Sequence, residues 1–283
     1  MLLDAHFHPL SALSSDSDST NGSLPNGLNT TPNKTSPSPI AIGGVGASAT
    51  PEEWGGLRLW SSRQKQPFIL GLHPWLAEVL ALNPQGENQL QNYLNSLEKL
   101  IGLDPAPCAI GEIGFDKVHS QIVNWAWQNK LFIAQYRLAQ KYALPIVIHC
   151  VKSYGYLLEA LSQLSRKFKE PLLKGLIHAF WGSPQLALRL VKLNFFISLN
   201  SRLLWNAKAL TSEGKNFKLT ALAKVIPLSQ LLLESDAPWG LPSSTYTKEL
   251  CSLLAPYWKV EAAQLQERAQ ANLRLFYNLP ANN

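Results

Sequence analysis

The chain contains six histidines, and five of them fall at or just beyond the ends of short apolar runs. These five are His6, His8, His73, His149 and His178. Two carboxylates, Glu112 and Asp236, follow other apolar runs in the same way. Imidazole together with carboxylate suits zinc, manganese, iron or nickel, whereas an oxygen-rich set would suit magnesium better. The residue types therefore predict a divalent-metal site, provided that the fold brings the ends of these runs together.

The pair His6 and His8 could serve such a site because residues two apart on a strand share one face. A lone His-x-His pair is more often a polar strand end whose hydrogen bonds are satisfied by other protein groups. Here the other histidines and carboxylates at the ends of apolar runs favour a metal-binding role. The candidate ligands are six in all, namely His6, His8, Glu112, His149, His178 and Asp236. Six are more than one tetrahedral site uses, so we expect two divalent ions about 3.5–4 Å apart. Glu112, central in chain order, is the expected bridging carboxylate.

The elements that must position these residues are eight short apolar runs. They cover residues 1–5, 40–42, 68–70, 108–110, 145–148, 176–177, 195–197 and 231–233. Continuous apolar runs are typical of parallel strands that are covered on both faces. Residues 123–142, 154–168, 183–193 and 261–277 show helical spacing between or after them. This alternation predicts a (β/α)8 TIM barrel, with a doubly wound sheet as the alternative, and barrel strands end together at the active-site face.

One segment does not fit this alternation. From Ser11 to Pro39, 24 of 29 residues are Ser, Thr, Asn, Pro, Gly or Asp. The other 254 residues match the roughly 250-residue size of one barrel. We therefore predict a single barrel domain over residues 1–283, irregular on its first flank, with residues 11–39 as a mobile loop insertion in place of the first helix. For residues 11–39 we favour a loop without a function of its own over a functional lid.

Composition excludes several classes of protein. With 46% hydrophobic and 16% charged residues, the chain is expected to be an ordered globular protein. No apolar run approaches the roughly 18 residues of a spanning helix, and the first residues lack the basic region of a secretory signal. Three scattered cysteines indicate neither a disulfide framework nor a zinc finger. We expect a cytoplasmic monomer that does not bind a membrane.

The positive charge is concentrated in the second half of the chain. Up to Cys150 there are 9 Lys and Arg against 11 Asp and Glu, and beyond it there are 16 against 8. A basic half suits a polyanionic partner such as nucleic acid, because Lys and Arg displace counterions from phosphates. A generic basic surface would explain the charge equally well.

Six ordered motifs resemble those of the TatD-like metal-dependent deoxyribonucleases, within the amidohydrolase-type barrels. The motifs are His6-Phe7-His8, Gly71-Leu72-His73-Pro74-Trp75, Ile110-Gly111-Glu112-Ile113-Gly114-Phe115-Asp116, Pro145-Ile146-Val147-Ile148-His149, His178-Ala179-Phe180-Trp181-Gly182 and Glu234-Ser235-Asp236-Ala237-Pro238-Trp239. The resemblance covers the whole chain except residues 11–39. One departure is that Val151 stands where an arginine is common in the family, with Lys152 next.

The resemblance implies a function and specific roles. His6, His8, Glu112 and Asp236 would hold one divalent ion, and Glu112, His149 and His178 the second. Asp236 would act as general base toward the attacking water, and Glu112 as the shared catalytic ligand. The ions could be Mg, Mn, Zn, Ni or Co. The expected activity is phosphodiester hydrolysis, of the 3′–5′ exonuclease type on single-stranded DNA, with RNA as a further substrate.

Other residues near the run ends are candidates for substrate contact. They are His73, Asp116, Arg202, Trp75, Trp181 and Trp239, where the tryptophans could stack on bases as in single-strand binders. Five of them have a structural alternative: His73 could shape a turn, Asp116 could cap a helix, and the tryptophans could pack. Arg202, just after the seventh run, is a candidate for binding phosphate. Glu234 could orient a ligand or merely bond to the backbone, and His119 is interpreted as a surface residue.

Two other functions stay open at this point. The same metals could cleave an amide or ester, as an aminoacyl-tRNA-type deacylase does, because barrels host many chemistries. The chain could also be a binding protein without catalysis, although the presence of all six expected ligands argues against this. The metal content of the purified protein would separate the second alternative from an enzyme.

Overall fold

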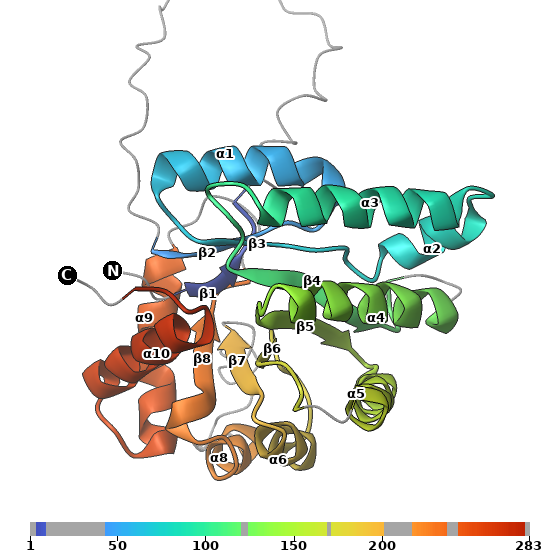
Figure 1. Ribbon diagram of the computed structural model, residues 1–283. Helices are drawn as coiled ribbons and strands as arrows, with labels where there is room; N and C mark the ends of the chain where they lie inside the picture. The colour runs from blue at the N-terminus through green and yellow to red at the C-terminus, as the bar shows by residue number, and fades with distance from the viewer. Residues whose placement is uncertain are drawn as a thin grey trace, which may run out of the picture.

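Eight parallel strands follow one another around a barrel (Figure 1). The computed structural model describes residues 4–9, 43–119, 124–168, 171–200, 217–236 and 243–280. The strands are β1 Asp4–Phe7, β2 Gly44–Ala47, β3 Phe68–Leu70, β4 Ala109–Asp116, β5 Ile146–Val151, β6 Gly175–Ile177, β7 Phe196–Asn200 and β8 Leu231–Glu234. Each strand pairs in parallel with the next, and after β8 the Asp236 N–H donates to the His6 carbonyl at 3.1 Å. The predicted barrel is confirmed.

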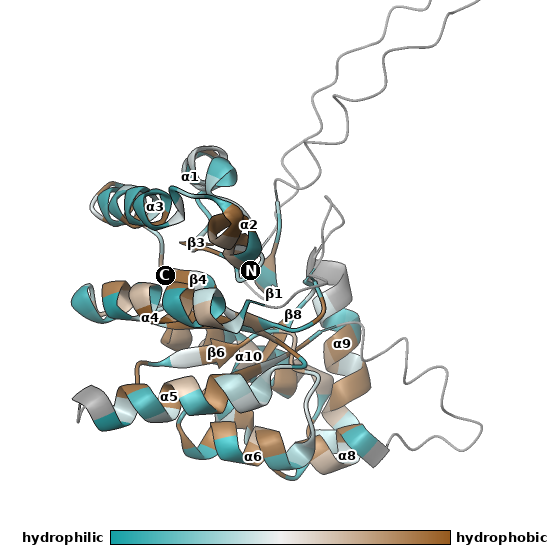
Figure 2. Ribbon diagram, turned by 90° about the vertical axis from the view of Figure 1, so that its right-hand side faces the viewer, coloured by the Kyte–Doolittle hydropathy of each residue, from teal (hydrophilic) through white to brown (hydrophobic). Residues whose placement is uncertain are grey.

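Helices surround the strands in the described part of the chain (Figure 1). They are α1 Trp54–Gln64, α2 Leu76–Leu82, α3 Gly86–Ile101, α4 Trp125–Lys141, α5 Tyr154–Phe168, α6 Pro184–Lys192, α8 Phe217–Ala223, α9 Ser243–Trp258 and α10 Ala262–Phe276, with 3-10 turns at Pro51–Glu53 and Leu228–Gln230. Figure 2 shows hydrophobic and hydrophilic residues along α4, α5 and α6, as expected for helices that pack one face on a sheet. None of the described helices has the length and apolar character needed to cross a membrane.

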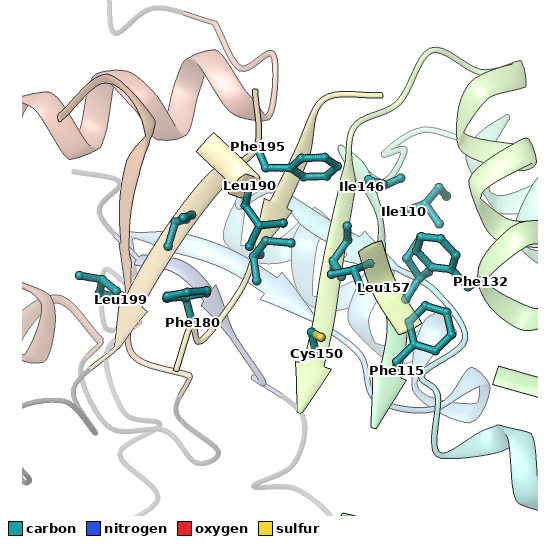
Figure 3. Packing of buried hydrophobic residues seen from close by; sticks show 14 of the residues in the cluster. Ile110, Phe115, Phe132, Ile146, Cys150, Leu157, Phe180, Leu190, Phe195 and Leu199 are labelled. Carbon is teal, nitrogen blue, oxygen red and sulfur yellow. The ribbon is translucent and has the colours of Figure 1, made fainter. Parts of the chain in front are cut away.

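The core has two layers because side chains alternate along each strand. On β3, Phe68 and Leu70 join the cluster between strands and helices, whereas Ile69 points into the barrel. Figure 3 shows members of the outer cluster, among them Phe132 of α4 and Leu190 of α6. The inner cluster fills the barrel interior, so the interior is a packed core over much of its depth.

The cluster of polar side chains lies two residues further along the same strands than the inner apolar cluster. Val147 and Leu176 belong to the inner apolar cluster, and the residues two positions later are His149 and His178. Residues two apart on a strand share a face, so these imidazoles lie directly above the apolar interior. The alternation of side chains along each strand therefore places a polar layer above the apolar core, toward the C-terminal ends of the strands.

Two strands differ from the sequence-based prediction. The second strand begins at Gly44, after the predicted run 40–42, which lies outside the described residues. A Cβ on Gly44 would lie 2.8 Å from Asp4 Cβ, and one on Gly46 would lie 2.7 Å from the Trp60 ring, so close packing requires glycine at both positions. The fourth strand extends to Asp116, and Glu112 lies within it rather than at its end. The predicted loop at residues 11–39 also lies outside the described residues.

Gln135 ties helix α4 to the chain segment that carries His73. Its fully buried side chain donates to the Leu72 carbonyl at 2.9 Å and accepts from the Leu72 N–H at 2.5 Å. In Gln135→Leu the N–H and the carbonyl of Leu72 would both lose their hydrogen-bond partner. We therefore expect the free energy of unfolding to fall by about 2–4 kcal/mol. Urea unfolding of the metal-free protein measures this change. The exposed Gln163→Leu on α5 is the control, with a change under about 0.5 kcal/mol. Equal urea midpoints for the two variants would contradict the assignment.

Candidate metal centre

Five of the six predicted metal ligands lie in the C-terminal half of a strand or just after it, and Glu112 lies in the middle of β4. His6 and His8 come from β1 and the residue after it, Glu112 from β4 and His149 from β5. His178 directly follows β6, and Asp236 follows β8 by two residues. Three overlapping groups each have ligand atoms within 4.8 Å of one another: His6, His8 and Glu112; His6, His178 and Asp236; and His73, Glu112 and His149. The fold thus brings all six ligands, and His73 with them, into one connected cluster.

One oxygen of the buried Glu112 carboxylate faces the histidines of the first strand. Glu112 Oε1 lies 3.0 Å from His6 Nε2 and 3.2 Å from His8 Nε2. His8 Nε2 lies 4.0 Å from Asp236 Oδ1. The four residues that the resemblance assigns to one ion therefore surround one side of the carboxylate.

The other carboxylate oxygen faces a second set of imidazoles. Glu112 Oε2 lies 2.7 Å from His178 Nε2 and 3.2 Å from His149 Nδ1. These two ring nitrogens are 3.1 Å apart. His73 Nε2 lies 3.5 Å from the same oxygen. Glu112 thus has one oxygen toward each histidine set, which is the arrangement that a bridging ligand needs.

The electrostatics of the cluster favour an ionised carboxylate among imidazoles. Burial opposes ionisation of Glu112, but the charges of His178 and His6 and hydrogen bonds from His149 and His178 hold its pKa well below its usual range. Burial likewise opposes protonation of His178, yet Glu112 raises the pKa of His178 well above its usual value. A cation bound here would therefore have to replace protons on these rings.

The donor set fits divalent metal ions. It combines imidazole nitrogens with two carboxylates, Glu112 and Asp236, in a cluster that is largely buried. Mixed nitrogen and oxygen donors suit zinc, manganese, cobalt or nickel better than magnesium, which prefers oxygen ligands. With two histidine sets on opposite oxygens of Glu112, the residues could hold two ions.

His73 differs from the other histidines in its hydrogen bonding. The Trp75 backbone N–H donates to His73 Nδ1 at 3.3 Å, which leaves the ring proton on Nε2, the nitrogen that faces Glu112. Burial, with His149 adding to it, lowers the pKa of His73 to about 3, so the ring is neutral at ordinary pH. A neutral ring with its N–H directed at the cluster suits a hydrogen-bond donor to substrate better than a metal ligand.

Glu234 holds the strand end that carries His178. Its fully buried carboxylate accepts from the Ala179 N–H at 2.6 Å and from Ser198 Oγ at 2.5 Å. Glu234 Oε1 also lies 3.6 Å from His178 Nδ1. Glu234 thus binds the backbone next to His178, and its orienting role toward the ring stays a prediction.

A pocket of about 510 Å³ opens beside the cluster. His149, His178 and Asp236 line it together with Trp181 and Lys152. Trp181 is 48% exposed, and Lys218 Nζ lies 4.3 Å from its ring centroid. The pocket therefore combines the metal-ligand candidates with an exposed aromatic ring and positive charge.

The remaining substrate candidates have different surroundings. Arg202 and Trp239 lie outside the described residues. Asp116 Oδ2 is 3.0 Å from His149 Nε2 and accepts from the Trp75 indole at 2.9 Å, and His119 is exposed and stacks on Trp75. The Asp116–His149 contact was missed by the sequence reasoning. The four-residue spacing of Glu112 and Asp116 on one strand, which puts both on the same face, could have indicated it.

Comparison with known proteins identifies one family over most of the chain. A profile of the family described as TatD related DNase matches residues 41–278. The "3'-5' ssDNA/RNA exonuclease TatD" of Cronobacter turicensis is 29% identical over 56% of this chain and 56% of its own length. The "Uncharacterized metal-dependent hydrolase YjjV" of Escherichia coli is 30% identical over 64% of this chain and 62% of its own length. In both matches the chain spans less than two thirds of the relative.

A solved structure shows the same fold. The crystal structure of YjjV, described as a TatD homolog from Escherichia coli, superposes with a TM-score of 0.65. The match covers 84% of this chain and 86% of that one, at 24% sequence identity. At this identity the likeness supports the barrel alone.

Proposed function

The chain belongs to the TatD related DNase family, and from this membership and the geometry of the cluster we propose that it is a divalent-metal-dependent phosphodiesterase that trims single-stranded DNA from the 3′ end. The observation that carries the proposal is the position of Glu112, whose two oxygens face two separate histidine sets. A carboxylate shared in this way is typical of two-metal hydrolytic sites. RNA is a further substrate in this proposal, because the name of the Cronobacter relative includes it.

The cluster residues divide into two ligand sets in this proposal. His6, His8, Glu112 and Asp236 hold one ion, and Glu112, His149 and His178 hold the other. Divalent ions in these positions would lower the pKa of water and neutralise charge on phosphate oxygens. His73 donates its Nε2 hydrogen to the phosphate of the substrate.

Asp236 acts as the general base. Its backbone N–H donates to the His6 carbonyl at 3.1 Å, which anchors the residue between β1 and the pocket. The side chain is 13% exposed, so it reaches the space where substrate and water would meet. A carboxylate next to both the ligands and the pocket can accept a proton from the attacking water.

The neighbouring pocket receives the terminal nucleotide. Its volume of about 510 Å³ lies within the range of small-molecule pockets. Base stacking tolerates any sequence because every base has a π-face, and Trp181 offers an exposed ring at the pocket. Lys152 lines the same pocket and supplies positive charge toward a phosphate.

End-labelled oligonucleotides test the proposal. The protein with Mn²⁺, Zn²⁺, Co²⁺ or Mg²⁺ should shorten single-stranded DNA that carries a 5′ label one nucleotide at a time, and a chelator should stop the reaction. His178→Ala, purified in the same way, controls for contaminating nuclease and should be inactive. If no metal supports cleavage, the nuclease proposal is wrong. Cleavage of a model ester or amide in the same preparation would then favour a deacylase.

A further inference from the structure

We propose that Asp116, held in place by Trp75, is a positioning residue that fixes His149 so that its Nδ1 atom serves the metal centre. The inference rests on the metal centre proposed above and adds a supporting pair to it. In sequence terms Asp116 and Trp75 were candidates for substrate contact. Their contacts in the structure indicate a different role for both.

The two nitrogens of His149 face different partners. Nδ1 points into the cluster, 3.2 Å from Glu112 Oε2 and 3.1 Å from His178 Nε2. Nε2 points away from it, 3.0 Å from Asp116 Oδ2. One nitrogen is therefore available to an ion and the other is occupied by a carboxylate.

Asp116 is fixed by several hydrogen bonds of its own. Oδ2 accepts from the Trp75 indole N–H at 2.9 Å. Oδ1 accepts from the backbone N–H groups of Val118 at 2.6 Å and His119 at 3.1 Å. The Gln128 side chain binds the backbone N–H and carbonyl of Asp116 at 3.0 and 2.8 Å. A buried carboxylate with this many contacts has one orientation, and that orientation faces His149.

The carboxylate decides which nitrogen of His149 carries the proton. An ionised carboxylate only accepts hydrogen bonds, so Nε2 must be the protonated nitrogen. When a cation replaces the proton on Nδ1, the Nδ1 lone pair is directed at the cluster. Metal-binding histidines commonly donate their second N–H to a carboxylate, which fixes the ring and strengthens the ligand.

The Trp75 ring is engaged in the same arrangement. Its indole N–H is used by Asp116, and its ring stacks on His119 with centroids 4.0 Å apart and planes inclined by 15°. His73 packs against it at 4.2 Å with an interplanar angle of 64°. Stacking of a base on the face that His119 covers would require His119 to leave. The geometry therefore points to support of the metal ligands as the role of Trp75.

Zinc affinity of the full-length protein tests this inference without substrate. After removal of metal, Zn²⁺ is titrated against a chromophoric chelator for the wild type and Asp116→Asn. We expect the variant to bind one of two ions about 10- to 100-fold more weakly. Asp104→Asn removes the same charge from an exposed site before β4, at the other end of the barrel, and should bind both ions as the wild type does. Equal affinities for Asp116→Asn and wild type would overturn the inference.

A second variant and a second measurement guard against a purely structural effect. Trp75→Phe keeps an aromatic ring but loses the indole N–H, and should weaken binding of the same ion about tenfold relative to Trp127→Phe, the effect of one hydrogen bond to an ionised carboxylate. If Asp116→Asn does not fold, the comparison of Trp75→Phe with Trp127→Phe tests the inference instead. Equal zinc affinities of these two variants would overturn it. ¹⁵N NMR of histidine in the zinc-loaded wild type should show the His149 proton on Nε2, and zinc on Nε2 would contradict the assignment. Because substrate is absent, these results are independent of whether DNA is cleaved.

Discussion

Glu112→Gln should lose hydrolytic activity by on the order of a thousandfold or more, equivalent to about 4 kcal/mol of transition-state stabilisation. The glutamine amide keeps one acceptor oxygen and replaces the other with an N–H donor, so it cannot be shared between two cations. The histidines on both sides of Glu112 would remain, but the negative charge between them would be gone. Initial rates on a single-stranded oligonucleotide at saturating metal measure the effect.

The matched control for this variant is Glu98→Gln, which removes a carboxylate that pairs with Lys141 on the outer helices. It should keep wild-type activity, because the outer face of α3 is remote from the strand ends. If Glu112→Gln retained activity within tenfold of the wild type, Glu112 would not be the shared ligand.

Asp236→Asn should lower kcat by about 10²- to 10⁴-fold, the usual contribution of a positioned general base. The asparagine side chain can still coordinate through its oxygen, so we expect the ion on the other oxygen of Glu112 to stay bound. The rate ratio of wild type to variant should shrink as the pH rises, because hydroxide from solvent replaces the missing base. Rates over a pH series with metal content measured in parallel test this.

Two outcomes would contradict the role given to Asp236. A kcat within tenfold of the wild type would exclude it as general base. A loss of both ions in the variant would show that its main effect is ligation, and the pH series would then carry no information about proton transfer.

Much of the barrel could be predicted because buried parallel strands are continuous apolar runs. The third, fifth, sixth and eighth runs coincide closely with β3, β5, β6 and β8. In β2 the signal fails, because two of its four residues are glycine. Gly44 and Gly46 make β2 invisible to an apolar-run criterion, although the packing against Asp4 and Trp60 requires them.

The metal-ligand set could be proposed from sequence because all strands of a parallel barrel end at the same face. The contacts between side chains at that face could not be predicted. Asp116 was expected at the substrate, yet its carboxylate lies 3.0 Å from His149. The 3.5 Å approach of His73 to Glu112 was also not predicted. These distances depend on the register between strands and on the turn after β3. The order of the motifs in the sequence determines neither of them.

Counting the ions bound by the full-length protein tests the two-metal centre most directly. The protein is stripped of metal, dialysed to equilibrium against Mn²⁺ or Zn²⁺, and its metal content is measured by mass spectrometry alongside Glu112→Gln. We expect two ions for each wild-type chain and at most one for each Glu112→Gln chain. One ion or none in the folded wild type at saturating metal would contradict it.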